Sequence, residues 1–355
     1  MSETLKTFSS SLRILAAGIL SLAAFIAVRL LPLGAPPRCA EAMIRAARIM
    51  DKATLAIREA QDRGGIGIDI TADPNRTGLI GPEIGPLMTT IGDLEAKRST
   101  TNPNIAGLLV YLLDRAGVRP GDHIAIGSSG SFPALLVASL AAAKALGIHP
   151  VTILSLGASS HGATDPEFTL LDIYDILRRE GICDAAPAAV SLGGDRDVGM
   201  EFEAGIKDSL ARKIRESGNF LLYEPDLVKN VSERMRLYER AAGGRISAFI
   251  NSGGGYANLG TSLRALDVPP GLNRTLALPN PSERGVLFEM AARNVPVVHL
   301  LFIKGLAAQS GLPWDPIPLP RPGLLHLPET KHTSGFWILA AAYFSLLSLL
   351  AAWRR

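Results

Sequence analysis

Cysteine is scarce in this chain: only Cys39 and Cys183 occur among the 355 residues, and neither belongs to a CxxC pair. Structural zinc sites and dithiol redox centres use paired cysteines at short spacing. The sequence therefore predicts neither a zinc site nor a redox centre. Asp195 and Asp197 could bind a hard cation together with Glu83 or Asp93, but turn and cap roles are more common for such aspartates, so no metal site is predicted. A disulfide between the two cysteines and two separate buried thiols are both compatible with this count.

Two further absences narrow the function. The net charge is only +3 and is spread along the chain, whereas a nucleic-acid-binding surface needs a cluster of basic residues. The chain has no Walker GKS/T motif, and Gly193-Gly194 does not extend into the GxGxxG pattern of dinucleotide-binding folds. We therefore expect no nucleic-acid partner and no nucleotide or other cofactor.

Long apolar runs, by contrast, stand near both ends of the chain. Residues 14–33 contain one charge, Arg29, and residues 335–353 contain none and have aromatic residues near their edges. About twenty apolar residues span a bilayer, and aromatic side chains gather at its interfaces. The sequence predicts two transmembrane helices on either side of a larger domain.

Basic residues near these runs predict the orientation in the cell membrane. Lys6 and Arg13 precede the first run, and Arg354 and Arg355 follow the second. The positive-inside rule then places both termini in the cytoplasm and the domain between them on the other side of the membrane. A cleaved signal peptide is the alternative for the first run, and the second run would anchor the protein in either case.

These features divide the chain into parts. We predict a cytoplasmic N-terminus (1–13), a transmembrane helix (14–33), a connecting helix and loop (34–92), an α/β domain (93–311), a proline-rich tether (312–334) and a second transmembrane helix (335–353).

Within the predicted α/β domain, short apolar strands alternate with helices. The clearest unit has a strand at Ile124-Ala125-Ile126, a turn of small residues, and an apolar helix over 134–146 that begins beside Pro133. Further strands are expected at 151–156, 188–192, 246–250 and 295–301. This alternation predicts an α/β fold with a doubly wound, mostly parallel sheet, Rossmann-like but without a nucleotide site.

Each predicted strand leads into a turn of small or polar residues. Ligands of open α/β sheets bind outside the carboxyl ends of the strands, so we expect these turns to meet in one crevice. Glycine-rich turns and helix N-termini offer N–H groups that favour carboxylates or phosphates. The alternative is that such turns need glycine and serine for geometry alone. The predicted ligand-binding residues are Ser128, Gly130, Ser131, Ser159, Ser160, Asp195, Asn251, Gly253, Gly254 and Lys304.

Ser129 also allows a catalytic interpretation. The sequence GSSGS around it is close to the GxSxG nucleophile elbow, and His161 in the next turn is the candidate general base. Hydrolases with that elbow carry their catalytic histidine late in the chain, and here His299 falls within a predicted strand. A ligand-binding turn is therefore favoured over a catalytic Ser129–His161 pair, and enzymatic activity is left open.

A charged run, DLEAKR at 93–98, precedes a helix that Asn102 and Pro103 begin. Such a run is typical of a face in contact with water. Its place in front of a capped helix leaves one wall of the crevice as the alternative.

Several stretches together resemble the poly-gamma-glutamate system protein family, whose members are membrane-associated and occur with the machinery of poly-gamma-glutamate synthesis and export. The resemblance covers most of the chain, from about residue 40 to about residue 330. It implies a pathway and no particular reaction, because no catalytic residues are carried over. The stretches are GDLEAKRSTTNPN (92–104), GSSGSFPA (127–134), GGG (253–255) with Asn258 and Gly260, PVVHLL (296–301) with Lys304-Gly305, and GLPWDPIP (311–318).

The resemblance and the crevice combine into one expectation: a membrane-anchored accessory protein of capsule-type poly-gamma-glutamate biosynthesis or export that binds an anionic, carboxylate-bearing ligand. The expected partners are poly-gamma-glutamate or a glutamate-like anion and other membrane subunits of the same machinery. Two alternatives are a hydrolase or transferase that acts on gamma-glutamyl amide bonds through a Ser/His site, and a non-catalytic membrane scaffold.

Overall fold

The computed structural model describes residues 3–30, 36–323, 325, 327 and 334–352. Residues 39–325 form one compact unit, and the described residues of the two chain ends form another. Parts of the predicted N-terminus (1–2), first apolar run (31–33), tether (324, 326 and 328–333) and last run (353) lie outside the described residues.

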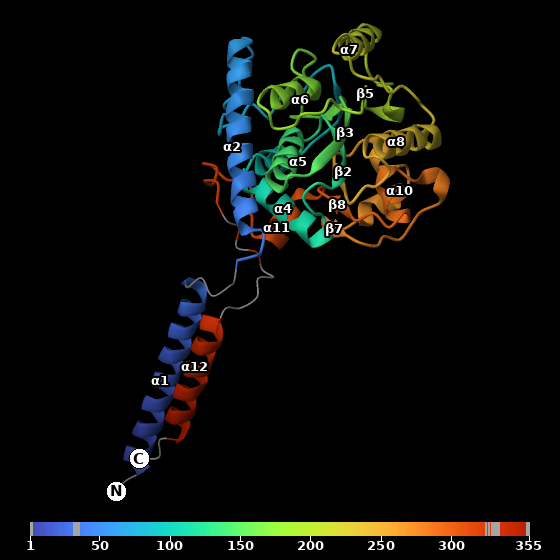
Figure 1. Ribbon diagram of the computed structural model, residues 1–355. Helices are drawn as coiled ribbons and strands as arrows, with labels where there is room; N and C mark the ends of the chain where they lie inside the picture. The colour runs from blue at the N-terminus through green and yellow to red at the C-terminus, as the bar shows by residue number, and fades with distance from the viewer. Residues whose placement is uncertain (1–2, 31–35, 324, 326, 328–333, 353–355) are drawn as a thin grey trace. The chain divides into compact units, whose positions relative to one another are not determined.

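The unit made of the chain ends is an antiparallel pair of helices, α1 (Glu3–Leu30) and α12 (Ser334–Ala352), which lie side by side in Figure 1. A hydrogen bond of 2.9 Å joins the hydroxyl groups of Ser21 and Tyr343. By length and composition, α12 is the one described helix that could cross a membrane, whereas α1 has a shorter apolar segment, Leu12–Val28. One candidate membrane span is therefore present among the described residues, and the predicted pair of spans is not confirmed.

A twisted sheet forms the centre of the other unit. Among the described residues it has six strands in the order β5-β3-β2-β6-β8-β7. Its strands are β2 (His123–Ser129), β3 (His149–Ser155), β5 (Ala189–Ser191), β6 (Phe249–Ser252), β8 (Val297–His299) and β7 (Gly271–Asn273), of which the last is an antiparallel edge strand. The mostly parallel α/β fold predicted from the sequence is confirmed. The chain winds outward in opposite directions from β2 and β6, so the switch point of the topology lies between these two strands.

Helices cover both faces of this sheet (Figure 1). One face carries α2 (Ala40–Arg63), α4 (Asn104–Ala116), α5 (Pro133–Leu146) and α6 (Leu170–Arg179), and the other carries α8 (Leu227–Ala241) and α10 (Val286–Ala292). Nearly all of α5 is buried, because it packs against the sheet on one side and against α2 and α4 on the other. A helix that is apolar all round needs such a place.

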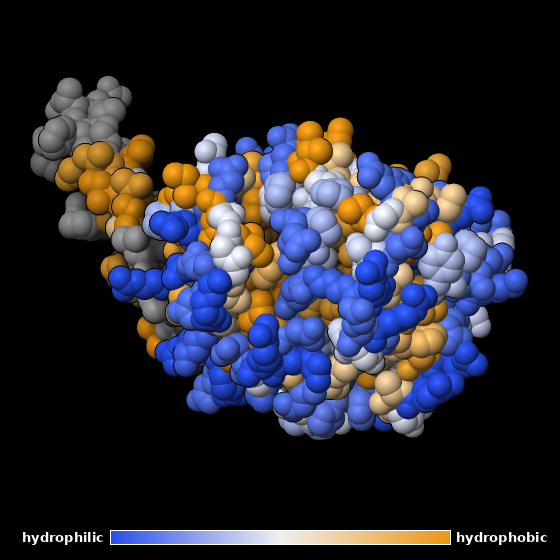
Figure 2. All heavy atoms as spheres, turned by 90° about the horizontal axis from the view of Figure 1, so that it is seen from above, coloured by the Kyte–Doolittle hydropathy of each residue, from blue (hydrophilic) through white to orange (hydrophobic). Residues whose placement is uncertain are grey.

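Beneath α8 and α10 lies an apolar core. Ala125, Ile153, Phe249 and Val297 extend from neighbouring strands into it, and Tyr238 of α8 donates a 3.0 Å hydrogen bond to the carbonyl oxygen of Ile126. Outside the core, hydrophilic residues cover most of the face that Figure 2 shows of this unit. The sheet is therefore a rigid support whose strand ends can present side chains to a ligand.

Shorter elements frame the carboxyl ends of the strands. β1 (Met88–Thr90) pairs with β4 (Ala158–Ser159) in a small parallel sheet beside the main one. The other short elements are α3 (Leu94–Thr100), α7 (Ala204–Glu216), α9 (Tyr256–Leu259), α11 (Ile303–Ser310) and the 3-10 turns Asp195–Asp197, Leu263–Asp267 and Pro281–Glu283.

The compact unit extends beyond the range 93–311 predicted for the α/β domain. On the N-terminal side, α2 packs against α4 and α5, because a stripe of apolar side chains on α2 is buried there. On the C-terminal side, Arg98 forms an ion pair with Asp315, and the indole of Trp314 donates to Glu95. The segment predicted as the start of a tether is therefore held against α3.

The two cysteines are free thiols. Cys183 is buried, and burial raises its pKa to about 11, so the thiol is protonated and unreactive at neutral pH. Of the two arrangements compatible with the sequence, the structure has separate thiols.

Candidate functional site

A cavity of about 560 Å³ opens at the carboxyl ends of the strands. Residues that follow β2, β3, β4, β5, β6 and β8 all line it, together with the loop after β1. We call this cavity the crevice. Its lining residues are Thr89, Thr90, Ile91, Gly92, Asp93, Ser129, Ser131, Phe132, Ser155, Gly157, Ser159, Gly194, Asp195, Glu201, Gly254, Gly255, Tyr256 and Leu301.

A row of serines, Ser129, Ser155 and Ser191, runs across the ends of three strands, and the first two of them line the crevice. Ser129 at the end of β2 is paired with Ser155 of β3, and Ser155 is paired with Ser191 of β5. Paired residues of neighbouring parallel strands point to the same face of a sheet. The side chains of Ser155 and Ser191 reach Arg234 of α8, so the row lies on the face that α8 covers.

A buried ion pair closes one end of this row. Arg234 Nη2 donates to Asp197 Oδ2 at 2.6 Å, and the two side chains are 0% and 1% exposed. Asp197 Oδ1 also accepts from Ser191 at 2.7 Å and from Ser155 at 3.1 Å, and Asn230 Nδ2 donates to Oδ2 at 3.0 Å. The two charges compensate each other, and their hydrogen bonds fix the ends of β3 and β5.

Ser129 differs from its two neighbours in the row. Its side chain is about 2% exposed, and its hydroxyl has no hydrogen-bond partner among the described residues. Gly253 faces it so closely that a Cβ at that position would lie 2.6 Å from the Ser129 nitrogen. A buried hydroxyl without a partner costs about 1–3 kcal/mol, which an oxygen-bearing ligand would recover.

Several residues that line the crevice together with Ser129 have free backbone N–H groups. Those of Ser131 and Phe132, where α5 begins, and those of Gly254 and Gly255 after β6 make no hydrogen bond to described residues. A helix of this length carries a partial positive charge at its N-terminus. Together with the Ser129 hydroxyl, these donors suit an oxygen-rich anion such as a carboxylate.

The lining of the crevice also contains acidic side chains. Asp195 and Glu201 line it, and the Glu201 carboxylate accepts a hydrogen bond of 3.0 Å from the backbone N–H of Asp195. No lysine or arginine is among the described lining residues. The lining therefore combines hydroxyl and N–H donors that suit an anion with carboxylate acceptors that suit N–H groups.

Lys97 lies directly behind the crevice. It is 2% exposed, and its Nζ donates to the Ser159 hydroxyl at 2.8 Å and lies 4.6 Å from the centre of the Phe132 ring. Burial lowers its pKa to about 7. The charged run that contains Lys97 was expected to face water, and this expectation is wrong for Lys97 because α3 packs that side chain against the turn after β2.

The sequence-predicted ligand-binding residues divide into two groups. Ser131, Ser159, Asp195 and Gly254 line the crevice. The remaining six do not belong to its described lining: Ser128, Gly130, Ser160, Asn251, Gly253 and Lys304.

The residues of the second group have other contacts. The Ser160 hydroxyl accepts from the N–H of Gly92 at 2.7 Å, and Asn251 hydrogen-bonds to His299 at 3.1 Å. Lys304 lies 5.6 Å from the centre of the Trp314 ring. Burial lowers the pKa of His299 to about 4, so its ring is neutral at pH 7 and adds no positive charge to the site.

The candidate pair of Ser129 and His161 is not hydrogen-bonded in the described part of the chain. His161 follows β4, and its backbone N–H donates a 3.0 Å hydrogen bond to the carbonyl oxygen of Pro82, in the loop before β1. Ser129 is the last residue of β2 and keeps an ordinary backbone conformation, whereas a nucleophile elbow is sharply turned.

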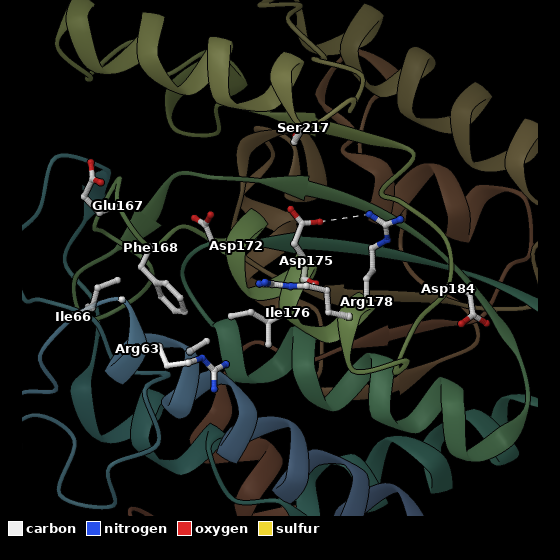
Figure 3. Close-up of a pocket in the computed structure, with 13 residues that line it drawn as sticks. Arg63, Ile66, Glu167, Phe168, Asp172, Asp175, Ile176, Arg178, Asp184 and Ser217 are labelled. Atoms are coloured by element: carbon white, nitrogen blue, oxygen red, sulfur yellow. Dashed lines mark hydrogen bonds and ion pairs between the residues drawn. The ribbon is translucent and has the colours of Figure 1, made fainter.

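A second and larger cavity, of about 860 Å³, lies beside α6 and the C-terminal end of α2. Figure 3 shows its charged side chains, with a dashed line between Asp175 and Arg178, whose closest atoms are 3.6 Å apart. Asp172, also in this lining, is paired with Lys213 at 2.5 Å. Because Asp175 and Asp172 are already paired and this cavity does not lie at the carboxyl ends of the strands, we regard the crevice as the better candidate.

Comparison of the chain with models of known protein families and with curated proteins gives no match.

Proposed function

We propose that this protein is a membrane-anchored accessory component of poly-gamma-glutamate synthesis or export and binds a carboxylate-bearing stretch of the polymer in the crevice. The observation that carries the proposal is the buried, unpartnered hydroxyl of Ser129 beside the free N–H groups at the start of α5. Each unit of the polymer has one free carboxylate, which would accept from these donors.

The acidic side chains of the crevice support the same ligand. A gamma-glutamyl chain has an amide N–H beside each carboxylate, and Asp195 or Glu201 would accept a hydrogen bond from it. A ligand that carries both acceptors and donors therefore fits this lining better than a simple inorganic anion does.

Membrane anchoring is supported by α12, whose segment Gly335–Ala352 is apolar and carries no buried residue. We propose that the first apolar run, in α1, is a second span and that the α/β unit faces away from the cytoplasm. Basic residues outside both runs support this orientation.

The binding proposal is tested with glutamate oligomers and the full-length chain in detergent micelles, by titration calorimetry. Ser129→Ala removes one hydrogen bond to a charged group, about 1.5–3 kcal/mol, and should weaken binding roughly ten- to hundred-fold. Gly253→Ala, which places a methyl group against Ser129, should weaken it at least as much.

The matched control is Ser209→Ala, an exposed serine on α7 whose hydroxyl bonds only to its own helix, and its affinity should equal that of the wild type. If Ser129→Ala and Gly253→Ala both bind the oligomer with the affinity of the wild type, the assignment of the site is refuted. A wild-type protein that binds no glutamate oligomer would refute the function and favour the scaffold role.

A further inference from the structure

A buried lysine without an acidic partner is expensive to maintain, because water no longer solvates the ammonium group. Lys97 is such a residue: no described carboxylate forms an ion pair with it, and burial is the cause of its lowered pKa. Structural lysines of this kind are rare, whereas lysines that act as bases in catalysis need this environment.

The contacts of Lys97 suit both of its protonation states. Its Nζ contacts the carbonyl oxygens of Ser131 and Ser159, which can only accept, and the hydroxyl of Ser159, which can accept or donate. A neutral amine has two N–H groups for the carbonyls and a lone pair for the hydroxyl proton. The ammonium form has a third N–H for the hydroxyl oxygen. A proton can therefore pass between Ser159 and Lys97 without any rearrangement.

Ser159 is also reachable from the crevice. It belongs to the lining and is about 8% exposed, whereas Lys97 lies behind it. Gly92 packs against both residues: a Cβ on Gly92 would lie 2.7 Å from Lys97 Cε and 3.0 Å from Ser159 Oγ. The glycine thus leaves just enough space for the two side chains to meet.

We propose that Ser159 is the nucleophile, and Lys97 its general base, of an acyl-transfer reaction on an ester or amide bound in the crevice. This inference goes beyond the proposed function, since binding a carboxylate requires no nucleophile. It differs from the Ser129–His161 pair in both the nucleophile and the general base.

The reaction balances with water as the co-reactant. Ser159 Oγ bonds to the acyl carbon as its proton passes to Lys97, and the carbonyl π electrons move onto oxygen. When the carbonyl re-forms, the bond to the leaving amine or alcohol breaks, and Lys97 returns the proton to it. Water then attacks the acyl-serine, gives a proton to Lys97, and releases the acid as Ser159 recovers its hydrogen.

The neighbourhood of Ser159 supports this chemistry. Its N–H donates to the Ser131 hydroxyl at 3.0 Å, which places it beside the start of α5. The free N–H groups of Ser131 and Phe132 there would stabilise the negative oxygen of the tetrahedral intermediate. The choice of a gamma-glutamyl group as the acyl donor rests on the proposed function, but the pairing of Ser159 with Lys97 does not.

An alkyl fluorophosphonate tests the pair without any oligomer. It bonds to an activated serine oxygen with loss of fluoride, and mass spectrometry of peptides from the full-length protein locates the adduct. We expect an adduct on Ser159, none in Ser159→Ala, and labelling at least 100-fold slower in Lys97→Met. Ser209→Ala should label at the wild-type rate. Labelling of Ser129 instead of Ser159, or an unchanged rate in Lys97→Met, would overturn the inference.

The pH dependence of the labelling rate of the wild type gives a second test, which requires no variant and so does not depend on whether a variant folds. Labelling should increase with pH with a midpoint near 7, as Lys97 loses its proton. The other ionisable groups of the described lining are the carboxyl groups of Asp93, Asp195 and Glu201 and the phenol of Tyr256, whose pKa burial raises above its ordinary value of 10; no histidine or cysteine is among them. A rate that rises only above pH 9 would overturn the role of Lys97. Because no oligomer is present, failure here is distinct from failure of polymer binding.

Discussion

The environment of Lys97 predicts an unusual dependence of stability on pH. Burial lowers its pKa from 10.5 to about 7. Between these two values the unfolded chain binds more protons than the folded one, so the free energy of unfolding rises with pH. This lowering of the pKa corresponds to about 5 kcal/mol in all, and roughly half of it falls between pH 6 and pH 9.

Lys97→Met isolates this contribution, because methionine fills a similar volume and does not titrate. The hydrogen bonds that the substitution removes shift stability by a similar amount at every pH. We therefore expect the difference in unfolding free energy, wild type minus Lys97→Met, to increase by about 2–3 kcal/mol from pH 6 to pH 9. Lys144→Met is the matched control, since Lys144 is exposed on α5, and its difference from wild type should stay constant.

Urea titration followed by tryptophan fluorescence measures this difference. Trp314 is a suitable reporter, because its indole N–H donates to Glu95 of α3 at 2.8 Å, close to Lys97 in the chain. Trp337→Phe and Trp353→Phe remove the remaining tryptophans. Parallel pH curves for the wild type and Lys97→Met would show that Lys97 stays charged in the folded protein, and would refute the reasoning.

Two further predictions concern ion pairs. Arg234→Met should lower the free energy of unfolding by about 3–5 kcal/mol in the same urea titration, because it leaves the charge of Asp197 buried and unpaired. Adding Asp197→Asn should restore part of the loss, because asparagine is uncharged and tolerates the positive φ of this position; equal stability of the single and double variants would contradict this. Asp315→Ala should lower the free energy of unfolding by only about 1 kcal/mol, because its ion pair with Arg98 is partly exposed. It should nevertheless accelerate proteolysis of residues 312–323, since this pair holds the segment against α3. An unchanged cleavage rate would show that the pair does not hold the segment.

The fold could be predicted because its evidence is local. A strand buried on both faces contains an unbroken apolar run, as in Ile124-Ala125-Ile126 of β2, and a helix covered on most sides is apolar over nearly all of its length, as in α5. The alternation of such segments allows few arrangements other than a parallel sheet. The turns that follow the strands then converge because parallel strands end at the same edge, so Ser131, Ser159, Asp195 and Gly254 meet in the crevice.

The essential contacts of the site could not be predicted in the same way. Nothing local distinguishes Lys97 from the charged residues beside it, because its burial depends on the turn after β2, which lies more than thirty residues away in the chain. The serine row had a readable signal, since β2, β3 and β5 all end on serine, but its register is set by pairing between strands. His161 shows the reverse case, in which a suitable residue in a suitable turn faces another loop.

The distribution of charge in the crevice bears on how a polymer would be handled. The buried arginine of the unit is neutralised by Asp197, and Arg98 is neutralised by Asp315, so neither is free to hold a ligand. A polyanion bound by several lysines or arginines would dissociate slowly, because each contact adds to the others. Hydroxyl and N–H donors around Ser129 can instead hold one carboxylate, while Asp195 and Glu201 repel its neighbours. If the crevice holds poly-gamma-glutamate as proposed, such a site would favour a polymer that moves past it one unit at a time and would bring successive amide bonds to Ser159.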